Sequence, residues 1–161
     1  MTTDQPSLKP GTEEAAPFVE PPGLAKAREL GSAGRTVVEA LGPDAFAGAT
    51  IDPEHGAADI YVTTEQAAEA VRSISPDARA HVVPLSYNEL VALRDRITVD
   101  REWFSSVGLE LRSWGPHVPD NVVRVGAPSF DSTAVRAVND RYGAHVQLVV
   151  DDSVLVPVGG R

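Results

Sequence analysis

Several short strings of residues occur twice in this chain, and this internal repeat limits the folds that the chain can adopt. The paired strings share an offset of 63 or 64 positions: Ala-Val-Arg at 70–72 and 134–136, Ala-His-Val at 80–82 and 144–146, Ile-Tyr-Val and Val-Arg-Val at 60–62 and 123–125, and Pro53 and Pro116. A repeat of this period indicates one supersecondary unit that is present in two copies.

Each copy reads as strand, turn, strand, helix and strand. Alternating apolar residues predict the strands, and apolar residues at helical spacing follow a capping side chain. The expected cap is Thr64 in the first copy, and Ser129 or Asp131 in the second. The expected strands are 46–51, 59–63 and 79–84 in the first copy, and 109–114, 121–126 and 145–150 in the second, where 115–120 is a loop.

The segments around the repeat complete an expected α+β fold. A capping box of Ser86 and Glu89 predicts an amphipathic connector helix. One helix cannot cover both faces of a three-stranded sheet, so we expect the two copies, the connector and the N-terminal helices to cover one another. We favour two three-stranded sheets, each with helices on one face; a single six-stranded sheet is the alternative. The expected segments are an acidic, proline-rich, disordered tail (1–23), short helices (24–44), a first ββαβ unit (45–84), the connector helix (85–107), a second ββαβ unit (108–152) and an extended C-terminal tail (153–161).

Composition excludes several classes of function. The net charge is −9 over 161 residues, and the basic residues are scattered, so neither nucleic acid nor an anionic membrane is an expected partner. The chain has no cysteine, which excludes disulfides and thiol nucleophiles. No apolar run is long enough to span a bilayer, and the first residues lack the pattern of a secretory signal. We therefore expect a cytoplasmic protein, or a secreted one if a leader has been removed.

No group of residues has the pattern of a catalytic site, so we expect a protein that is not an enzyme and that uses no cofactor. Neither serine-protease nucleophile motif occurs, and no glycine-rich phosphate loop is present. His55 and His117 fall in the two loops, and His81 and His145 fall at matched repeat positions. No two are spaced as metal ligands, so structural or solvent-facing histidines are expected and no metal site is predicted.

The expected functional surface is the last strand together with the segment that follows it. A strand at a sheet edge exposes backbone donors and acceptors that can pair with another chain. An edge covered by the chain's own tail is the alternative. The candidate protein-binding residues are His145, Gln147 and Val149 in the strand, Val154, Leu155 and Val156 in the tail, and the aromatic residues Trp103 and Trp114, which core packing explains most simply unless they are exposed.

The string Leu-Gly-Pro-Asp-Ala-Phe-Ala-Gly-Ala-Thr-Ile-Asp at 41–52 resembles the propeptides of actinobacterial secreted serine proteases of the alpha-lytic protease and streptogrisin type. The likeness continues through Val-Thr at 62–63, Ser-Tyr-Asn-Glu-Leu at 86–90 and the strand-turn-strand at 108–125, and it covers about 41–150. It implies an α+β module that binds a protease domain, templates its folding and occludes its active site with a C-terminal tail, here 153–158 by position alone. As the sequence reads, no signal peptide precedes this module and no protease domain follows it, so a stand-alone relative is also consistent.

The leading hypothesis is a non-catalytic protein-interaction module, related to protease pro-segments, whose partner is a serine protease domain or another protein. A small-molecule or metal-binding sensory domain, with a pseudo-two-fold pocket between the units, is the alternative. An enzyme is the third possibility, and no set of residues in the sequence supports it.

Overall fold

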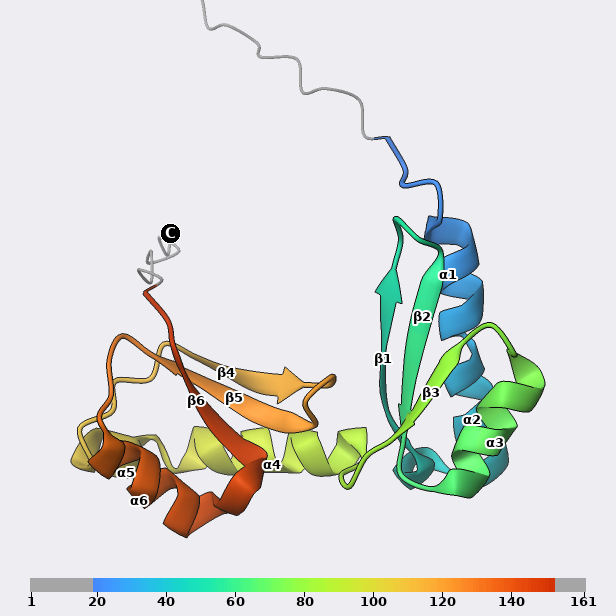
Figure 1. Cartoon of the computed structure of the whole chain (residues 1–161). Helices are drawn as coiled ribbons and strands as arrows, with labels where there is room; N and C mark the ends of the chain where they lie inside the picture. Colours follow the sequence, from blue (N-terminus) through green and yellow to red (C-terminus); the bar gives the residue numbers. More distant parts are fainter. Residues whose placement is uncertain (1–18, 153–161) are drawn as a thin grey trace, which may run out of the picture.

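The computed structural model describes residues 19–152 and contains two three-stranded sheets (Figure 1). In each sheet the first two strands form an antiparallel hairpin, and the third strand lies parallel to the second. This arrangement confirms the α+β class and the two ββαβ units, and the strand order corrects the alternative of one six-stranded sheet. The strands are β1 (Phe46–Asp52), β2 (Ala57–Val62) and β3 (Arg79–Val82) in the first sheet, and β4 (Ser113–His117), β5 (Val122–Ala127) and β6 (Val146–Val150) in the second.

Three of the described helices begin where a side-chain cap satisfies an amide group of the first turn. Thr64 accepts a hydrogen bond from the Ala67 amide at 3.1 Å, and Asp131, rather than Ser129, caps the equivalent helix. Ser86 and Glu89 form the predicted capping box. The helices are α1 (Leu24–Gly31), α2 (Ala33–Leu41), α3 (Glu65–Ile74), α4 (Tyr87–Val99), α5 (Arg101–Ser106) and α6 (Ser132–Tyr142), with short 3₁₀ turns η1 (Pro43–Ala45) and η2 (Gly143–His145).

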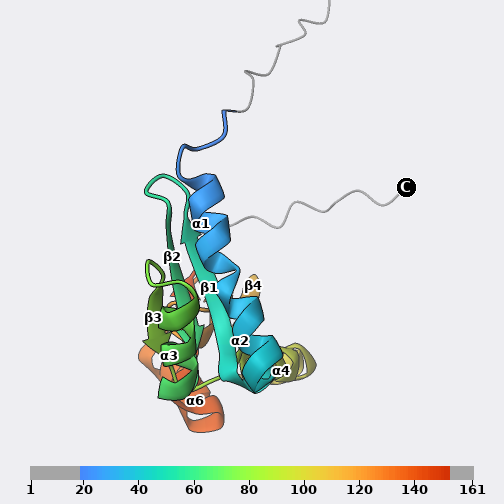
Figure 2. The same cartoon turned by 90° about the vertical axis from the view of Figure 1, so that its right-hand side faces the viewer.

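The core of the first unit is built largely from small side chains. Helices α1, α2 and α3 lie on the same face of the sheet, toward the viewer in Figure 2. Five of its ten buried core residues are alanine, which lets the helix and sheet backbones approach closely. The core consists of Leu30, Ala33, Val37, Ala58, Ile60, Val62, Ala67, Ala68, Val71 and Ala78.

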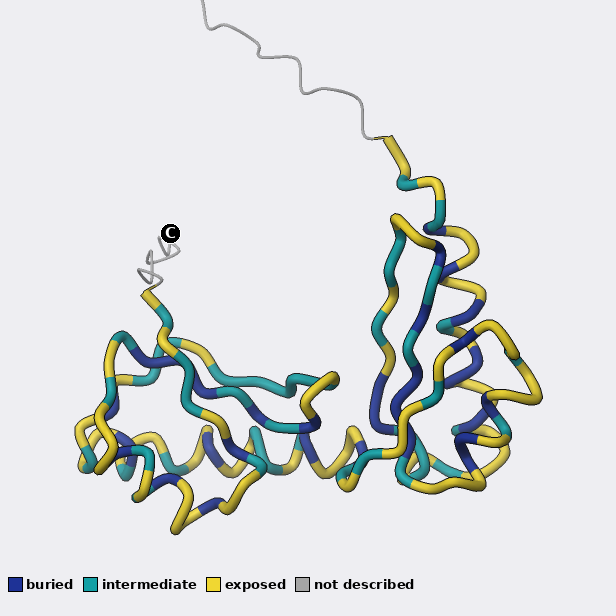
Figure 3. Tube along the Cα trace, viewed as in Figure 1, coloured by how far each residue is buried: buried dark blue, intermediate teal, exposed yellow. Residues whose placement is uncertain are grey.

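The core of the second unit contains larger side chains. Helices α4 and α6 contribute to it, and Phe104 of α5 is fully buried in it. Figure 3 shows buried and exposed stretches alternating along the helices, so each helix turns one side to the core. Only two of its eleven buried residues are alanine. The core consists of Leu90, Ile97, Phe104, Leu109, Val123, Val125, Ala127, Ala134, Val138, Tyr142 and Val146.

Each sheet keeps one face free of helices. The two units, each with its helices, form the two arms of the molecule in Figure 1, and both free faces lie inside the angle between these arms. The N-terminal helices and the connector supply cover, as expected, but they do so on the face that the unit's own helix already covers. The expectation that the two copies cover each other is therefore wrong. Residues on the free faces are largely polar, which is why neither face needs apolar cover.

The two arms meet at the hairpin turn between β4 and β5. Asn121 is 3% exposed, and its side-chain amide donates to the Leu85 carbonyl and accepts from the Leu85 amide, both at 2.8 Å. Val118, in the same turn, packs directly against Gly48 of β1, where a Cβ would lie 2.6 Å from the valine methyl. Gly48 has φ +132 at a bulge in β1, so glycine is required there for both its conformation and its closeness to Val118.

The duplication is real, but its register differs from that of the sequence match. Both hairpin turns have four residues and end in a left-handed residue, Gly56 (φ 61) or Asn121 (φ 53). Aligning them pairs β2 with β5 at an offset of 65, and the two strands then have the same burial pattern. With this alignment the helix caps match at an offset of 67 positions and the last strands at an offset of 68.

The structure corrects three sequence expectations. His145 lies in η2, ahead of β6, so it is not equivalent to His81 of β3. Pro116 lies within β4 and does not match the turn residue Pro53. The expected strand at 109–114 begins only at Ser113, because Leu109 is buried in the core and its amide bonds to the Phe104 carbonyl at the end of α5.

Candidate protein-binding edge

Strand β6 is an edge of the second sheet, as the sequence analysis expected. The Asp151 amide donates to the Ala127 carbonyl of β5 at 2.9 Å. Because backbone groups alternate along a strand, the amides of Leu148 and Val150 point away from β5. The Val150 side chain is 64% exposed. The outer side of β6 therefore offers backbone groups that could pair with an added strand.

The other three edge strands each carry a feature that discourages strand addition. Strand β1 is bulged at Gly48, which Val118 covers. Strand β3 has four residues and carries the charge of Arg79. Strand β4 contains Pro116, which has no backbone donor. Strand β6, with the sequence Val-Gln-Leu-Val-Val, has no charge, proline or recorded register shift.

A surface pocket of about 400 Å³ lies beside the first half of β6. The residues that line it include Val135 and Asn139 of α6, Leu148 of β6, and Asp120 of the β4–β5 turn. Val135 and Asn139 are one helical turn apart, so they form one stripe of α6 along the edge of the sheet. A strand added to β6 would have side chains of its helix-facing side next to this stripe.

The helix-free face of the second sheet is tied together across its middle strand. The Ser113 hydroxyl donates to the Asp151 carboxylate, and this contact passes over Gly126, whose missing side chain leaves room for it. Arg124 donates to Asp120 at 2.6 Å and to the Gln147 side chain at 3.3 Å. These contacts tie both ends of β6 to the rest of its sheet.

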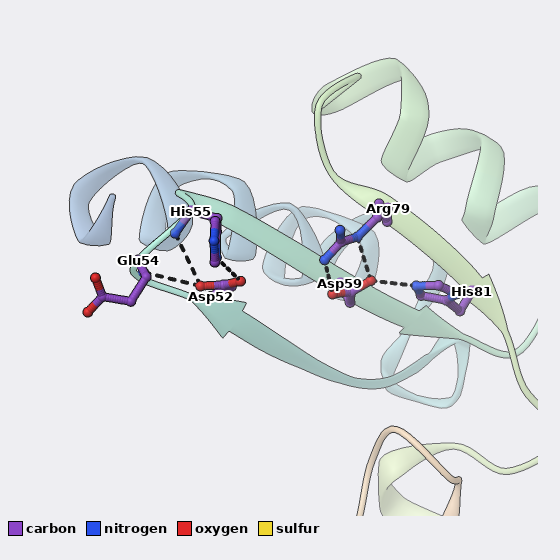
Figure 4. Close-up of polar contacts among 6 residues, drawn as sticks. All are labelled: Asp52, Glu54, His55, Asp59, Arg79 and His81. Carbon is purple, nitrogen blue, oxygen red and sulfur yellow. Dashed lines mark hydrogen bonds and ion pairs between the residues drawn. The ribbon is translucent and has the colours of Figure 1, made fainter. Parts of the chain in front are cut away.

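The helix-free face of the first sheet carries a different polar cluster (Figure 4). Arg79 donates two hydrogen bonds to Asp59, at 2.6 and 2.8 Å, and the His81 ring lies 2.7 Å from the same carboxylate. The hydrogen bonds from Arg79, followed by those from His81, hold the pKa of Asp59 below its ordinary value against the opposing effect of burial. The Tyr61 ring stacks on His81 at a centroid distance of 5.0 Å.

A second pair extends this surface to the β1–β2 turn. The His55 ring lies 2.7 Å from Asp52, and its hydrogen bond lowers the pKa of that carboxyl. In Figure 4 the two clusters lie along one face of the sheet, and no hydrogen bond or ion pair is drawn between them. Within residues 19–152 no three His, Asp or Glu side chains gather as metal ligands would.

The two tryptophans lie in packing contacts of the second unit, away from β6. The Trp103 ring packs under Arg141 at 4.6 Å, and the Trp114 indole donates to Thr98 at 2.8 Å. Beside them, burial and the hydrogen bond to Asp100 raise the pKa of Tyr142 to about 12. Both indoles are half-buried, so the structure does not gather them with the strand residues into one surface.

The expected site residues are thus only partly brought together. Gln147 and Val149 lie on the helix-free side of β6, His145 precedes the strand, and Val154, Leu155 and Val156 lie outside the described residues. Sequence reasoning missed Val135 and Asn139, because the repeat match had paired Val135 with the core residue Val71. In the structure the buried counterpart of Val71 is Val138.

Comparisons with known proteins add little to this description. No family model matches the chain, and neither does any curated protein. Among solved structures, the periplasmic domain of the T3SS inner membrane protein PrgH from S. typhimurium matches at 12% identity and a TM-score of 0.27, over 79% of this chain and 78% of that one. A second structure of the PrgH periplasmic domain matches at 11% identity and a TM-score of 0.28, over 84% and 74%. A likeness this low supports no argument about function.

None of the helices in the part of the chain that the structure describes combines the length and apolar character needed to cross a membrane.

Proposed function

We propose that this protein is a non-catalytic binding module that takes up an extended strand of a protein partner along the outer side of β6. The observation that carries the proposal is the contrast among the four sheet edges. Three are bulged, charged or interrupted by proline, and β6 alone among the described strands is an uncharged edge with none of these features.

The partner class follows from the resemblance of residues 41–150 to serine-protease pro-segments. A pro-segment-like module would bind a protease domain of the alpha-lytic protease or streptogrisin type and block its active site. Both helix-free sheet faces turn to the same side (Figure 1), so a partner domain that extends from β6 over the helix-free face of its sheet would approach the polar face of the first sheet. Polar and charged side chains there would suit a partner surface that is itself hydrated.

Proline substitution at β6 tests the proposal with little disturbance of the fold. The Val150 amide points away from β5, so Val150→Pro removes an outer donor without removing a bond of the sheet. Val82 is the structurally equivalent residue of β3, since the Val83 amide bonds to the Val62 carbonyl. Val82→Pro is therefore a matched control on an edge that is not proposed to bind.

The measurement is inhibition of a purified protease domain of that type by the wild-type chain and the two variants. We expect inhibition by the wild type, a loss of about tenfold or more in Val150→Pro, which corresponds to about 1.4 kcal/mol, and no change in Val82→Pro. Equal inhibition by all three proteins would show that β6 is not the binding edge. Absence of inhibition by the wild type would remove the protease as the partner.

A further inference from the structure

The outer side of β6 is complementary to itself when two copies of the chain meet in antiparallel order. A two-fold axis through Leu148 would place Val146 opposite Val150 of a second copy. Gln147 would lie opposite Val149. All these pairs are uncharged, so no like charges face each other across the two strands. The two sheets would then form one continuous sheet, with three strands from each copy.

The backbone groups of β6 suit this register. Because backbone groups alternate along a strand, Val146, Leu148 and Val150 point their amides and carbonyls away from β5. With Leu148 on the axis, each of these residues faces an outward-pointing residue of the other copy. A shift of two residues in either direction would leave Val146 or Val150 without a strand residue opposite it.

The side chains of β6 favour a second copy, because the strand carries both a projecting side chain and a space that can receive it. Val150, at the end of the strand, is 64% exposed. The pocket of about 400 Å³ lies beside the first half of the strand, where Val146 and Leu148 line it together with Val135 of α6. Val146, Leu148 and Val150 lie on the same, helix-covered side of the sheet. Antiparallel pairing therefore brings Val150 of each copy to the pocket of the other, and the two-fold axis supplies this contact twice.

The net charge of −9 does not oppose this contact at the strand itself. Strand β6 contains no charged residue, and the acidic pair at 151–152 follows it. In the antiparallel dimer the two acidic pairs would lie beyond opposite ends of the paired strands, roughly 20 Å apart. This separation is more than twice the Debye length of about 8 Å at physiological ionic strength. Added salt should therefore leave the dimer intact or strengthen it.

We infer that two copies of the chain pair through β6 in antiparallel order when no partner is present, with Leu148 on the two-fold axis and Val150 of each copy in the pocket of the other. The inference goes beyond the proposed function, because it gives the same edge a second occupant. The dimer withholds the edge from a partner strand until it dissociates. Since the other described edge strands are bulged, charged or interrupted by proline, the association closes at two copies.

Sedimentation equilibrium of the whole chain tests the dimer. We expect a reversible monomer–dimer equilibrium in the wild type. Val150→Pro removes an outward amide at both ends of the contact, and Val150→Ser keeps the amide but removes the apolar side chain. Each should raise the dissociation constant about tenfold or more, whereas the matched edge control Val82→Pro should leave it unchanged. A wild type that stays monomeric up to its solubility limit, or a dimer that both Val150 variants leave unchanged, would overturn the inference.

Single cysteine substitutions test the register, because the chain has no cysteine of its own. Leu148→Cys would place two thiols on opposite residues of a hydrogen-bonded pair, with Cα atoms about 5.5 Å apart, which a disulfide can span. Gln147→Cys would place them on a diagonal of about 7–8 Å, beyond the usual reach of a disulfide. Mild oxidation should therefore link Leu148→Cys into a covalent dimer far more efficiently than Gln147→Cys. The reverse order of yields would overturn the register and with it the inference.

Inhibition of the protease domain separates this inference from the proposed function. The oxidised Leu148→Cys dimer has no open β6 and should not inhibit, whereas the same variant should inhibit after reduction. If the oxidised and reduced forms inhibit equally, the use of β6 by the partner is overturned and the dimer stands. If the wild type inhibits while remaining monomeric at every concentration, the dimer is overturned and the proposed function stands.

Discussion

The two units have the same ββαβ order of elements and differ in their last strand, β3 or β6. In the first, β3 is a short edge in which Arg79 and His81 are both held by Asp59 of the neighbouring strand. In the second, the equivalent positions of β6 are Gln147 and Val149, and the central residue is Arg124 rather than a carboxylate. The two units thus share one strand order, and the residues at these positions leave the edge strand uncharged in the second unit alone.

The same comparison extends to the cores. The first core is half alanine, while the second contains Phe104 stacked on Tyr142 at a centroid distance of 5.6 Å. Larger buried side chains remove more apolar surface from water, so the second unit should be the more stable support. A stable scaffold under an open edge is what strand addition requires, since the edge must stay ordered while it is unpaired.

The largest expected effect comes from the second core. Phe104→Ala should lower the free energy of unfolding of the second unit by about 3–5 kcal/mol, because a fully buried ring leaves a cavity. Ile60→Ala is the counterpart in the first unit, with an expected loss of about 2–5 kcal/mol.

Amide hydrogen exchange of both variants shows how far the two cores are separate. Each substitution should speed exchange mainly in its own sheet. Equal loss of protection in both sheets from either change would contradict the description of two cores.

The next effect concerns the turn that joins the arms. Asn121→Ala leaves both backbone groups of Leu85 without their partner and places alanine at a positive φ, so we expect a loss of about 3 kcal/mol in the free energy of unfolding. Asn121→Gly keeps the backbone conformation of its counterpart Gly56 and should lose about 1 kcal/mol less. Denaturant unfolding measures both, and equal losses would show that the left-handed conformation costs nothing here.

The smallest of these effects depends on pH. The pKa of Asp59 is lowered in the folded state, so its cluster stabilises the fold fully above the unfolded pKa, and this stabilisation is lost as the pH falls through the lower folded value. Asp59→Asn should therefore cost about 1 kcal/mol at about pH 7 and progressively less at an acidic pH below the unfolded pKa of an aspartate. A cost that stays the same at both pH values would show that the carboxylate charge is not what matters.

Much of this fold can be predicted from the sequence, because the local signals are strong. The Ser86–Glu89 capping box, the Thr64 cap and the alternation of Ile60 and Val62 each specify an element without tertiary information. The repeat itself is also visible. Its register is not, because Ala-Val occurs twice in α6, at 134–135 and 137–138, and only the packing decides that Val138, not Val135, is buried.

Part of the candidate site could also be predicted from the order of the elements along the chain. A final apolar strand after a crossover helix is expected at an edge, and β6 lies there. The pocket depends on where α6 lies over that edge, and the protection of β3 depends on Arg79 and Asp59 meeting across strands. Neither follows from the spacing of residues along the chain.

The most direct test of an open β6 is amide hydrogen exchange of the isolated chain, residue by residue. Exchange should be fast at Leu148 and Val150, whose amides point outward, and slow at Asp151, whose amide bonds to β5. Binding of a partner strand should then protect Leu148 and Val150 while leaving Val82 of the first unit unchanged. Slow exchange at Leu148 and Val150 in the isolated, monomeric chain would contradict the account, because the edge would already be covered.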